Sequence, residues 1–322
     1  MPRDGTLGRM IDALEVVIRR HCDPPDPRAH VMPIALKPLR LAATGLLALA
    51  ALGLAGTAQA AAAEPTPAPR PTERPVAVIP AAKIPPKPPA ALNLYDADGF
   101  RYQDPYYSAC VAAAGMDMLN FVSLAGAGGH DFTWQRTRSG TDVQSMLTWA
   151  RAHDTLEGGS GSDPHGWRNV LNYYGWGSDA LLEGQRVYDD ASYKTYAGAV
   201  KAAVRAMILT DKPVGVLGWA GRHAQMITGY YGLKGDPFAK DSSGAWTNTF
   251  TVDGFYFADP LKSDGFVNVK ISYTRLRDST NPELRFRPYT ETDSLLDDRY
   301  TTGSVASKSE WYGKYVLVIP RR

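Results

Sequence analysis

Residues 103 to 120 read Gln103-Asp-Pro-Tyr-Tyr-Ser-Ala-Cys-Val-Ala-Ala-Ala-Gly-Met-Asp-Met-Leu-Asn120. The stretch opens with turn-forming residues and continues with small and apolar residues at helical spacing. It predicts a helix that Ser108 caps and that carries Cys110 in its first turn. A thiol at a helix N-terminus has a lowered pKa, because the helix dipole favours the thiolate. Cys110 is therefore a candidate nucleophile, the alternative being a small buried apolar residue.

The chain before this stretch divides into three parts. Residues 1–31 precede Met32, and we interpret them as a non-native extension from a misplaced start codon. Residues 32–60 have a basic start, an apolar run and a small-residue end, the pattern of a secretory signal peptide; the alternative is an uncleaved signal anchor, since the run is about 20 residues long. Residues 61–93 hold ten of the chain's 24 prolines, which predicts an extended Pro/Ala-rich linker.

Removal of the signal peptide has two consequences for the mature chain. Cys22 is lost, so Cys110 becomes an unpaired cysteine in a secreted protein, which is a candidate reactive thiol. Residues 1–60 also hold seven of the 35 Lys/Arg and five of the 33 Asp/Glu, which leaves 28 of each. A neutral chain without a basic run offers no electrostatic footprint for nucleic acid or an anionic membrane surface, so we expect neither as a partner.

Residues 94–322 are expected to form one domain, because aromatic and aliphatic residues recur to the end without a second low-complexity break. Helical periodicity marks the first half, and short β-rich segments separated by Gly, Pro, Asp and Ser mark the second. This predicts an α+β domain, with an N-terminal helical half followed by an antiparallel β-sheet. Helices are expected from Cys110 and at 142–150, 167–174 and 196–209, and strands at 213–219, 223–230, 254–259, 266–272 and 315–319.

Three residues have the chemistry to assist Cys110. His223 begins a β-like segment, where a general base would be held rigidly. Asp259 ends the next strand, where its carboxylate could accept the second ring N–H of His223 and fix the tautomer. Gln103 lies seven positions before the cysteine, within reach for its amide to join the Cys110 backbone N–H in binding a developing oxyanion. Structural roles, as a satisfied histidine and a turn-forming Asp before proline, are the alternatives.

These motifs together resemble the papain-like cysteine peptidases typified by the bacteriocin double-glycine-leader peptidases. The resemblance covers about Gln103 to Pro260 and is carried by the stretch quoted above with Lys212-Pro-Val-Gly-Val216, His223-Ala-Gln-Met-Ile-Thr-Gly-Tyr230 and Ala258-Asp-Pro260. It implies a papain-like fold with Cys110 as nucleophile, His223 as general base, Asp259 as orienter and Gln103 as oxyanion donor. Two features depart from the family: Val111-Ala112 stands where Gly-Pro is usual, and the glutamine commonly lies six positions before the cysteine.

The expected function is a secreted thiol hydrolase that cleaves a peptide or amide bond through a Cys110 acyl-enzyme, with a peptide or protein as substrate. Two alternatives use the same fold. One is a transamidase or acyltransferase, which differs in the acceptor of the acyl group. The other is a secreted non-catalytic binding domain, which the departures from the family and the aromatic residues from Trp167 to Trp176 favour.

The sequence points to no cofactor or metal. Arg151-Ala-His-Asp154 and Gly161-Ser-Asp-Pro-His-Gly-Trp167 bring His and Asp together but lack a third ligand at metal spacing, so we expect loops there. Asp96-Ala-Asp-Gly99 begins like a calcium loop, yet Tyr107 stands where the twelfth-position glutamate would fall, so we expect a turn.

Overall fold

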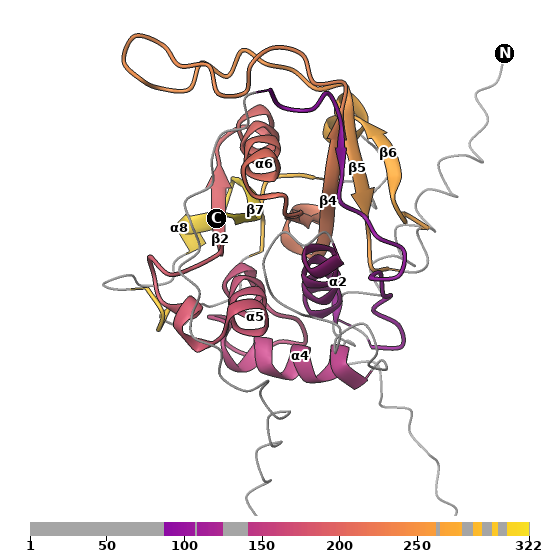
Figure 1. Cartoon of the computed structure of the whole chain (residues 1–322). Coiled ribbons are helices and arrows are strands. Elements are labelled where there is room, and N and C mark those ends of the chain that lie inside the picture. The colour runs from indigo at the N-terminus through magenta and orange to yellow at the C-terminus, as the bar shows by residue number, and fades with distance from the viewer. Residues whose placement is uncertain are drawn as a thin grey trace, which may run out of the picture. The chain divides into compact units, whose positions relative to one another are not determined.

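In the computed structural model, seven strands among the described residues form one antiparallel sheet (Figure 1). Six follow the order β2 (Tyr188–Tyr193), β7 (Tyr315–Pro320), β3 (Val214–Gly218), β4 (His223–Tyr231), β5 (Gly254–Ala258) and β6 (Val269–Ser272). The seventh, β1 (Leu92–Asn93), pairs with β4 near its end. Each pairing is antiparallel, which confirms the predicted sheet and its five predicted strands.

The structure describes residues 87–106, 108–124, 141–261, 265–278, 286–291, 298–301 and 308–321. The predicted extension and signal peptide, and the linker up to residue 86, lie outside the described residues. The described residues all belong to one compact unit of the chain. Among them, no helix combines the length and apolar character needed to cross a membrane.

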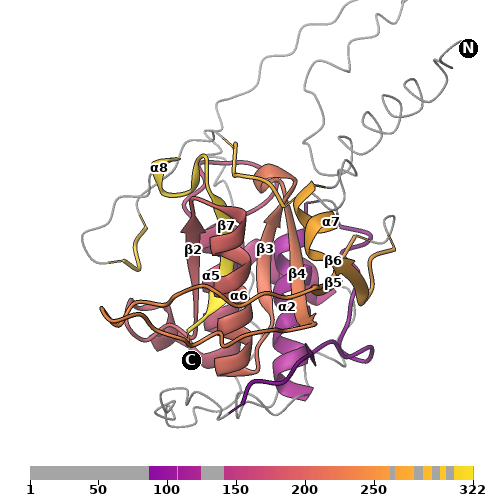
Figure 2. The ribbon, with the colours of Figure 1, turned by 90° about the horizontal axis from the view of Figure 1, so that it is seen from above.

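Helices cover both faces of the sheet. They are α2 (Cys110–Leu124), α4 (Thr141–Ala152), α5 (Pro164–Trp176), α6 (Tyr196–Thr210), α7 (Tyr273–Asp278) and α8 (Lys308–Trp311). Strand β7 shows how the two cores arise, since its side chains alternate between faces. Val316 and Val318 pack with α2, α4 and α5, whereas Leu317 and Ile319 pack with α6. Figure 2 shows α6 in front of the strands and α2 behind them.

Helix α2 lies in the middle of the first core, and its side chains are buried from Cys110 to Val122. Its small residues allow close packing against α5, where a Cβ on Gly115 would lie 3.1 Å from Val170. The fully buried Trp167 of α5 fills the space between this helix and β3, where Gly215 faces it. Burial of such side chains contributes about 1.5–3 kcal/mol each, so α2 is held rigidly where Cys110 begins it.

Local sequence signals set the ends of the other helices. Asp163 caps α5 by accepting a hydrogen bond from Gly166 N, and Pro164 follows it in the first turn, which Pro favours. Thr195 caps α6 through Gly198 N, and Asp211 ends that helix in the left-handed conformation. These helices contain the predicted ranges 167–174 and 196–209, and α4 contains 142–150, so all three predictions are confirmed.

Two strands and the short helices α7 and α8 were not expected from the sequence. Strand β2 lies between α5 and α6, so the helical half is not purely helical. Strand β1 lies at the end of the predicted linker, where Leu92 pairs with Tyr230 and Ala90 O accepts a hydrogen bond from Leu233 N. The last residues assigned to the linker are therefore part of the sheet.

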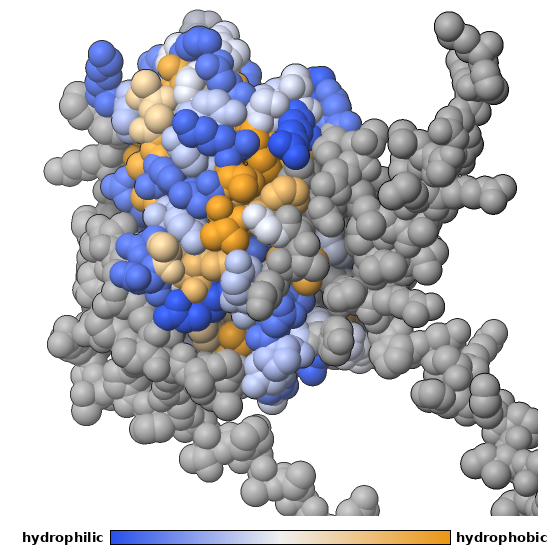
Figure 3. Space-filling model, turned by 90° about the vertical axis from the view of Figure 1, so that its right-hand side faces the viewer, coloured by the Kyte–Doolittle hydropathy of each residue, from blue (hydrophilic) through white to orange (hydrophobic). Residues whose placement is uncertain are grey.

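The segment between β4 and β5 (residues 232–253) crosses over α6 (Figure 2). Arg205 of α6 donates from Nε to Pro237 O at 2.6 Å, and its guanidinium lies over the rings of Trp246 and Phe250. Figure 3 shows another face, at the right-hand side of Figure 1, where apolar residues gather in the middle among hydrophilic ones. The large apolar side chains exposed among the described residues are Tyr102, Leu182, Trp246 and Tyr312.

Candidate active site

Cys110 is the first residue of α2, as the sequence predicts. Ser108 does not cap this helix as the sequence predicts. Its hydroxyl lies 2.9 Å from that of Ser160, and its backbone has a left-handed φ of 61°. The Cys110 side chain is 6% exposed. It therefore sits at the positive end of the helix dipole and at the surface of the apolar core.

His223 and Asp259 form a buried pair beside this thiol. His223 begins β4, and Asp259 immediately follows β5, the neighbouring strand. His223 Nε2 lies 2.6 Å from Asp259 Oδ1, and neither side chain is exposed to solvent. A carboxylate in this position holds the ring and stabilises its protonated form. Because Nε2 engages Asp259, Nδ1 is the ring nitrogen left to exchange a proton with the thiol.

The pKa of the Cys110 thiol is lowered. Burial raises it, but the hydrogen bond and the charge of His223 and a hydrogen bond from the backbone of Ala224 act in the opposite direction and outweigh burial. The charge of Asp259 works against the thiolate to a smaller extent. The thiolate, which is the nucleophilic form, is thus favoured relative to an ordinary cysteine.

Asp259 is held by more than the histidine. Its Oδ1 also accepts a hydrogen bond from Leu261 N at 2.8 Å, and its Oδ2 accepts one from Gln225 Nε2 at 2.5 Å. Gln225 was not singled out in the sequence. The only signal available there is its spacing, because residues two apart on a strand share a face and His223 and Gln225 are two apart on β4.

A cleft opens at this group of residues. Its walls come from the start of α2, from the loop before α5, from β3 and from the turn into β4; the lining residues are Ser108, Cys110, Val111, Gly161, Ser162, Leu217, Gly221, Arg222, His223 and Ala224. Cys110 and His223 both reach it, whereas Asp259 lies behind the histidine. A substrate carbonyl could therefore reach the thiol while the His223–Asp259 pair stays dry.

The turn from β3 to β4 has an unusual backbone. Trp219, Ala220 and Gly221 all have positive φ, of 50°, 60° and 107°. A non-glycine residue in this region carries a conformational cost and persists only where its surroundings hold it. Thr290 N donates to Ala220 O at 2.8 Å, and a Cβ on Gly221 would lie 2.5 Å from the Tyr289 ring. The turn also places the Trp219 ring 4.5 Å from the His223 ring.

Gln103 lies next to Pro260, the residue after Asp259. It is buried, its backbone N–H donates to Pro260 O at 2.9 Å, and its carbonyl accepts from Tyr106 N. It is not among the residues that line the cleft, and its Oε1 is buried with no hydrogen-bond partner among the described residues. The structure thus brings together Cys110, His223 and Asp259, while the role of Gln103 as oxyanion donor stays a prediction.

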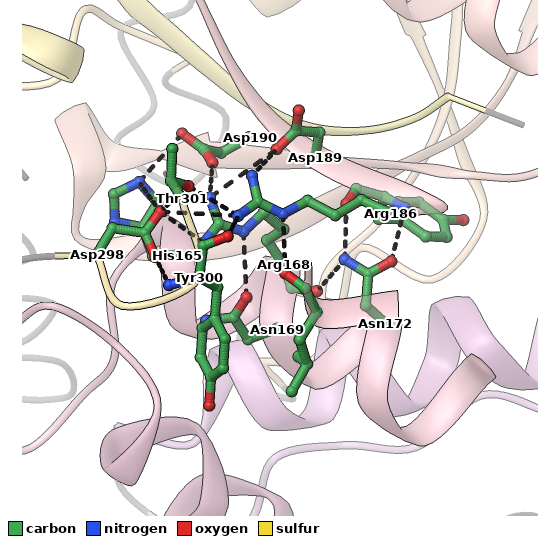
Figure 4. Close-up of polar contacts among 12 residues, drawn as sticks. His165, Arg168, Asn169, Asn172, Arg186, Asp189, Asp190, Asp298, Tyr300 and Thr301 are labelled. Atoms are coloured by element: carbon green, nitrogen blue, oxygen red, sulfur yellow. Dashed lines mark hydrogen bonds and ion pairs between the residues drawn. The ribbon is translucent and has the colours of Figure 1, made fainter. Parts of the chain in front are cut away.

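A second buried polar group lies between α5, β2 and the C-terminal segments (Figure 4). The Arg168 guanidinium donates to Asp190 Oδ1 at 2.7 Å and to Asp298 Oδ2 at 3.0 Å. Arg186 pairs with Asp189 and donates to Tyr300 O. The two segments predicted as loops are partly helical: Gly161–Trp167 enters α5 at Pro164, and Arg151–Asp154 begins in the last turn of α4. Helix α5 leads into an ion-pair network that fastens residues 298–301 to the helical layer.

His165 belongs to this network. Its Nε2 lies 3.1 Å from Glu310 Oε1 and 3.6 Å from Asp190 Oδ2, so the chain supplies the further ligand-type groups that local spacing did not show. These three ligand atoms lie within 4.8 Å of one another. Burial lowers the pKa of His165, but the hydrogen bond to Glu310 and the charge of Asp190 raise it above the ordinary value. Asp190 is already bonded to Arg168 and to Trp311 Nε1, so we interpret the group as ion pairs.

The segment from Asp96 to Gly99 is a turn, as predicted. Asp98 N donates to Asp96 Oδ1 at 2.9 Å, and Gly99 N donates to Asp96 O at 3.2 Å. The side chain of Asp96 is thus used to close the turn.

Comparisons with known proteins add little to this geometry. No family model and no curated protein matches the chain. A crystal structure of UfSP from C. elegans is similar, with a TM-score of 0.32 and 14% sequence identity. The match covers 70% of this chain and 32% of that one, so this chain spans about a third of the length of the UfSP chain. At this TM-score the likeness supports no conclusion, and the side chains around Cys110 carry the functional inference.

Proposed function

We propose that the domain is a cysteine-type hydrolase with a papain-like fold, which cleaves a peptide or amide bond. The observation that supports it most is the meeting of Cys110, at the start of a buried helix, with the His223–Asp259 pair from two neighbouring strands. Acyl transfer to a thiol requires a base that contacts the nucleophile and a group that orients the base. His223 and Asp259 can serve in these two roles for Cys110. The cleft gives a substrate access to the thiol.

In the proposed reaction, the Cys110 thiolate attacks the carbonyl carbon of the scissile bond, and the carbonyl oxygen takes up the negative charge. The His223 imidazolium then donates its proton to the leaving amine as the C–N bond breaks, which yields a thioester. Water attacks the thioester with His223 accepting its proton, and the carboxylic acid and the thiolate are released. Asp259 keeps the ring oriented and stabilises its positive charge throughout.

The developing oxyanion needs hydrogen-bond donors. The backbone N–H of Cys110 is one candidate, because the first N–H groups of a helix have no intrahelical partner. The Gln103 side chain remains the second proposed donor, since its backbone is tied to Pro260 beside the catalytic group. Substitution of Gln103 by Ala would then lower kcat more than it changes KM.

Secretion is also a proposal. It rests on the signal-like pattern of residues 32–60, with Cys110 as the one cysteine that remains after cleavage at about Ala60. The expected partner is then an extracellular peptide or protein substrate. Expression of the full chain with sequencing of the secreted N-terminus tests this, and a product that still begins before residue 60 would contradict it.

The test of the chemistry is the alkylation rate of Cys110 as a function of pH, in the full chain and in its His223→Ala variant. A thiol that reacts with a pKa well below about 8.5 in the wild type, and near 8.5 in the variant, supports the proposal. Cys110→Ala gives the background, including Cys22. An ordinary thiol profile in both proteins favours a non-catalytic binding domain instead. With a substrate in hand, products formed in the presence of an added amine separate hydrolysis from acyl transfer.

A further inference from the structure

Three hydrogen bonds hold the buried carboxylate of Asp259. Oδ1 is shared by His223 Nε2 at 2.6 Å and the Leu261 backbone at 2.8 Å. Oδ2 accepts from Gln225 Nε2 at 2.5 Å. A carboxylate can rotate about its Cβ–Cγ bond, and donors on both oxygens prevent that rotation. The bond to Gln225 therefore keeps Oδ1 directed at the histidine.

Strand pairing leaves space for the Gln225 side chain. On β3, Gly218 is paired with His223 and Val216 with Gln225. A Cβ on Gly218 would lie 2.0 Å from Gln225 Oε1 and 2.9 Å from its Cδ. Any larger residue at 218 would thus displace the amide from Asp259. Gly218 of β3, which has no side chain, thus leaves room for the Gln225 side chain of β4.

We propose that Gln225 is a positioning residue of the reaction, which acts through Asp259 to hold His223 in place against Cys110. The inference rests on the proposed function and extends the group to a fourth side chain. Gln225 is 1% exposed and does not line the cleft. Asp259 joins it to His223, because one carboxylate oxygen bonds each residue. In this role the effect of Gln225 passes through the carboxylate of Asp259.

The physical consequence of losing the amide is a change in proton affinities. Without the amide, the buried Oδ2 would lose a hydrogen-bond donor, which disfavours the charged form of Asp259. The titratable groups that face this carboxylate include His223 on β4 and, beyond it, Cys110 on α2. A weaker or misdirected carboxylate stabilises the imidazolium less, so the thiolate–imidazolium pair would exist over a narrower pH range.

The experiment measures Cys110 alkylation against pH in the full chain and in two variants of Gln225. Gln225→Met keeps the length and removes the donor, and we expect its acid limb to move up by about one pH unit, which makes alkylation on that limb about tenfold slower. Gln225→Glu places a second carboxyl against Asp259. Such a pair shares one proton, so this variant donates while protonated and fails when the proton leaves. Its defect should therefore grow as the pH rises.

Thr228→Val is the matched control. Thr228 is buried on the same strand, and its hydroxyl has no hydrogen-bond partner among the described residues, so we expect the wild-type profile. An activated wild-type thiol with an unchanged profile in Gln225→Met would overturn the role of Gln225 and leave the proposed function intact. An ordinary wild-type thiol would overturn both. If Gln225→Met does not fold, Gln225→Glu decides, and a defect independent of pH would contradict the inference.

Discussion

Asp259 Oδ1 lies 2.6 Å from His223 Nε2; both side chains are buried, and of the two only His223 lines the cleft. The charge of the pair is therefore screened much less than that of an exposed pair. His223 begins β4 and Asp259 directly follows β5, and these strands pair with each other, so the sheet itself sets their separation. The proposed chemistry therefore depends on Asp259, a residue that does not line the cleft.

The first prediction concerns the charge of that residue. Asp259→Asn keeps the shape but removes the negative charge, so the imidazolium loses its stabilisation and the thiol pKa moves up toward about 8.5. We expect alkylation at pH 6 to slow by on the order of a hundredfold. Asp253→Asn is the control, because Asp253 is exposed and pairs with Lys234 away from the cleft. Equal rates in both variants would show that Asp259 has only a structural role.

The second prediction concerns stability and the thiol. The pKa of Cys110 is lowered in the folded state, so folding favours its deprotonation. The resulting stability is present above the unfolded pKa of about 8.5 and is lost as the pH falls through the lowered folded value. Cys110→Ser, which does not titrate here, should lose stability relative to the wild type as the pH rises from 6 to 9. Urea unfolding across this range measures the difference, and a constant difference contradicts a lowered pKa.

How far the sequence predicts the site depends on how each residue acts. Cys110, His223 and Asp259 carry chemistry of their own and stand at the ends of periodic segments, so pattern and order were enough to select them. Gln225 acts only through Asp259, 34 positions further along the chain, and its partner is known only once β4 and β5 are paired. Glu310 reaches His165 across 145 positions for the same reason.

The missed strands have a similar explanation. Strand β2 carries Asp189, Asp190 and Ser192, so it lacks the apolar alternation that marks a half-buried strand. Its acidic residues are stabilised instead by Arg168 and Arg186, from α5 and the loop before β2. Strand β1 is two residues long and follows a proline-rich stretch, so amino-acid composition does not distinguish it from the linker.

The third prediction concerns the loop that forms one wall of the cleft. The pKa of Asp154 is raised to about 7 by burial and by the charge of Asp163, and its Oδ2 accepts from the hydroxyl of Ser162, a cleft residue. A raised carboxyl pKa means that the folded state holds the proton more tightly, so stability falls as the pH rises from about 4 to about 7.

Asp154→Asn should remove that fall. We expect the variant to exceed the wild type by about 2 kcal/mol in the free energy of unfolding at pH 8, with little difference at pH 4, where both are uncharged at this position. Denaturant unfolding at the two pH values measures this. Asp179→Asn, on an exposed turn, is the control. A variant less stable than the wild type at pH 8 would show that the carboxylate itself is needed.

The fourth prediction concerns the packing that holds the nucleophile helix against the sheet. A Cβ on Gly215 would lie 2.6 Å from Cη2 of Trp167, which is fully buried. Gly215→Ala should therefore overpack the core and cost about 1–3 kcal/mol, since neither strand nor indole can move freely. Trp167→Phe provides the missing space, at the cost of a cavity. In the double variant, the alanine should fill part of that cavity. The double variant should therefore lose much less free energy of unfolding than the sum of the losses in the two single variants. Urea unfolding of the four proteins measures the coupling, and additive effects would show that Gly215 and Trp167 do not share this space.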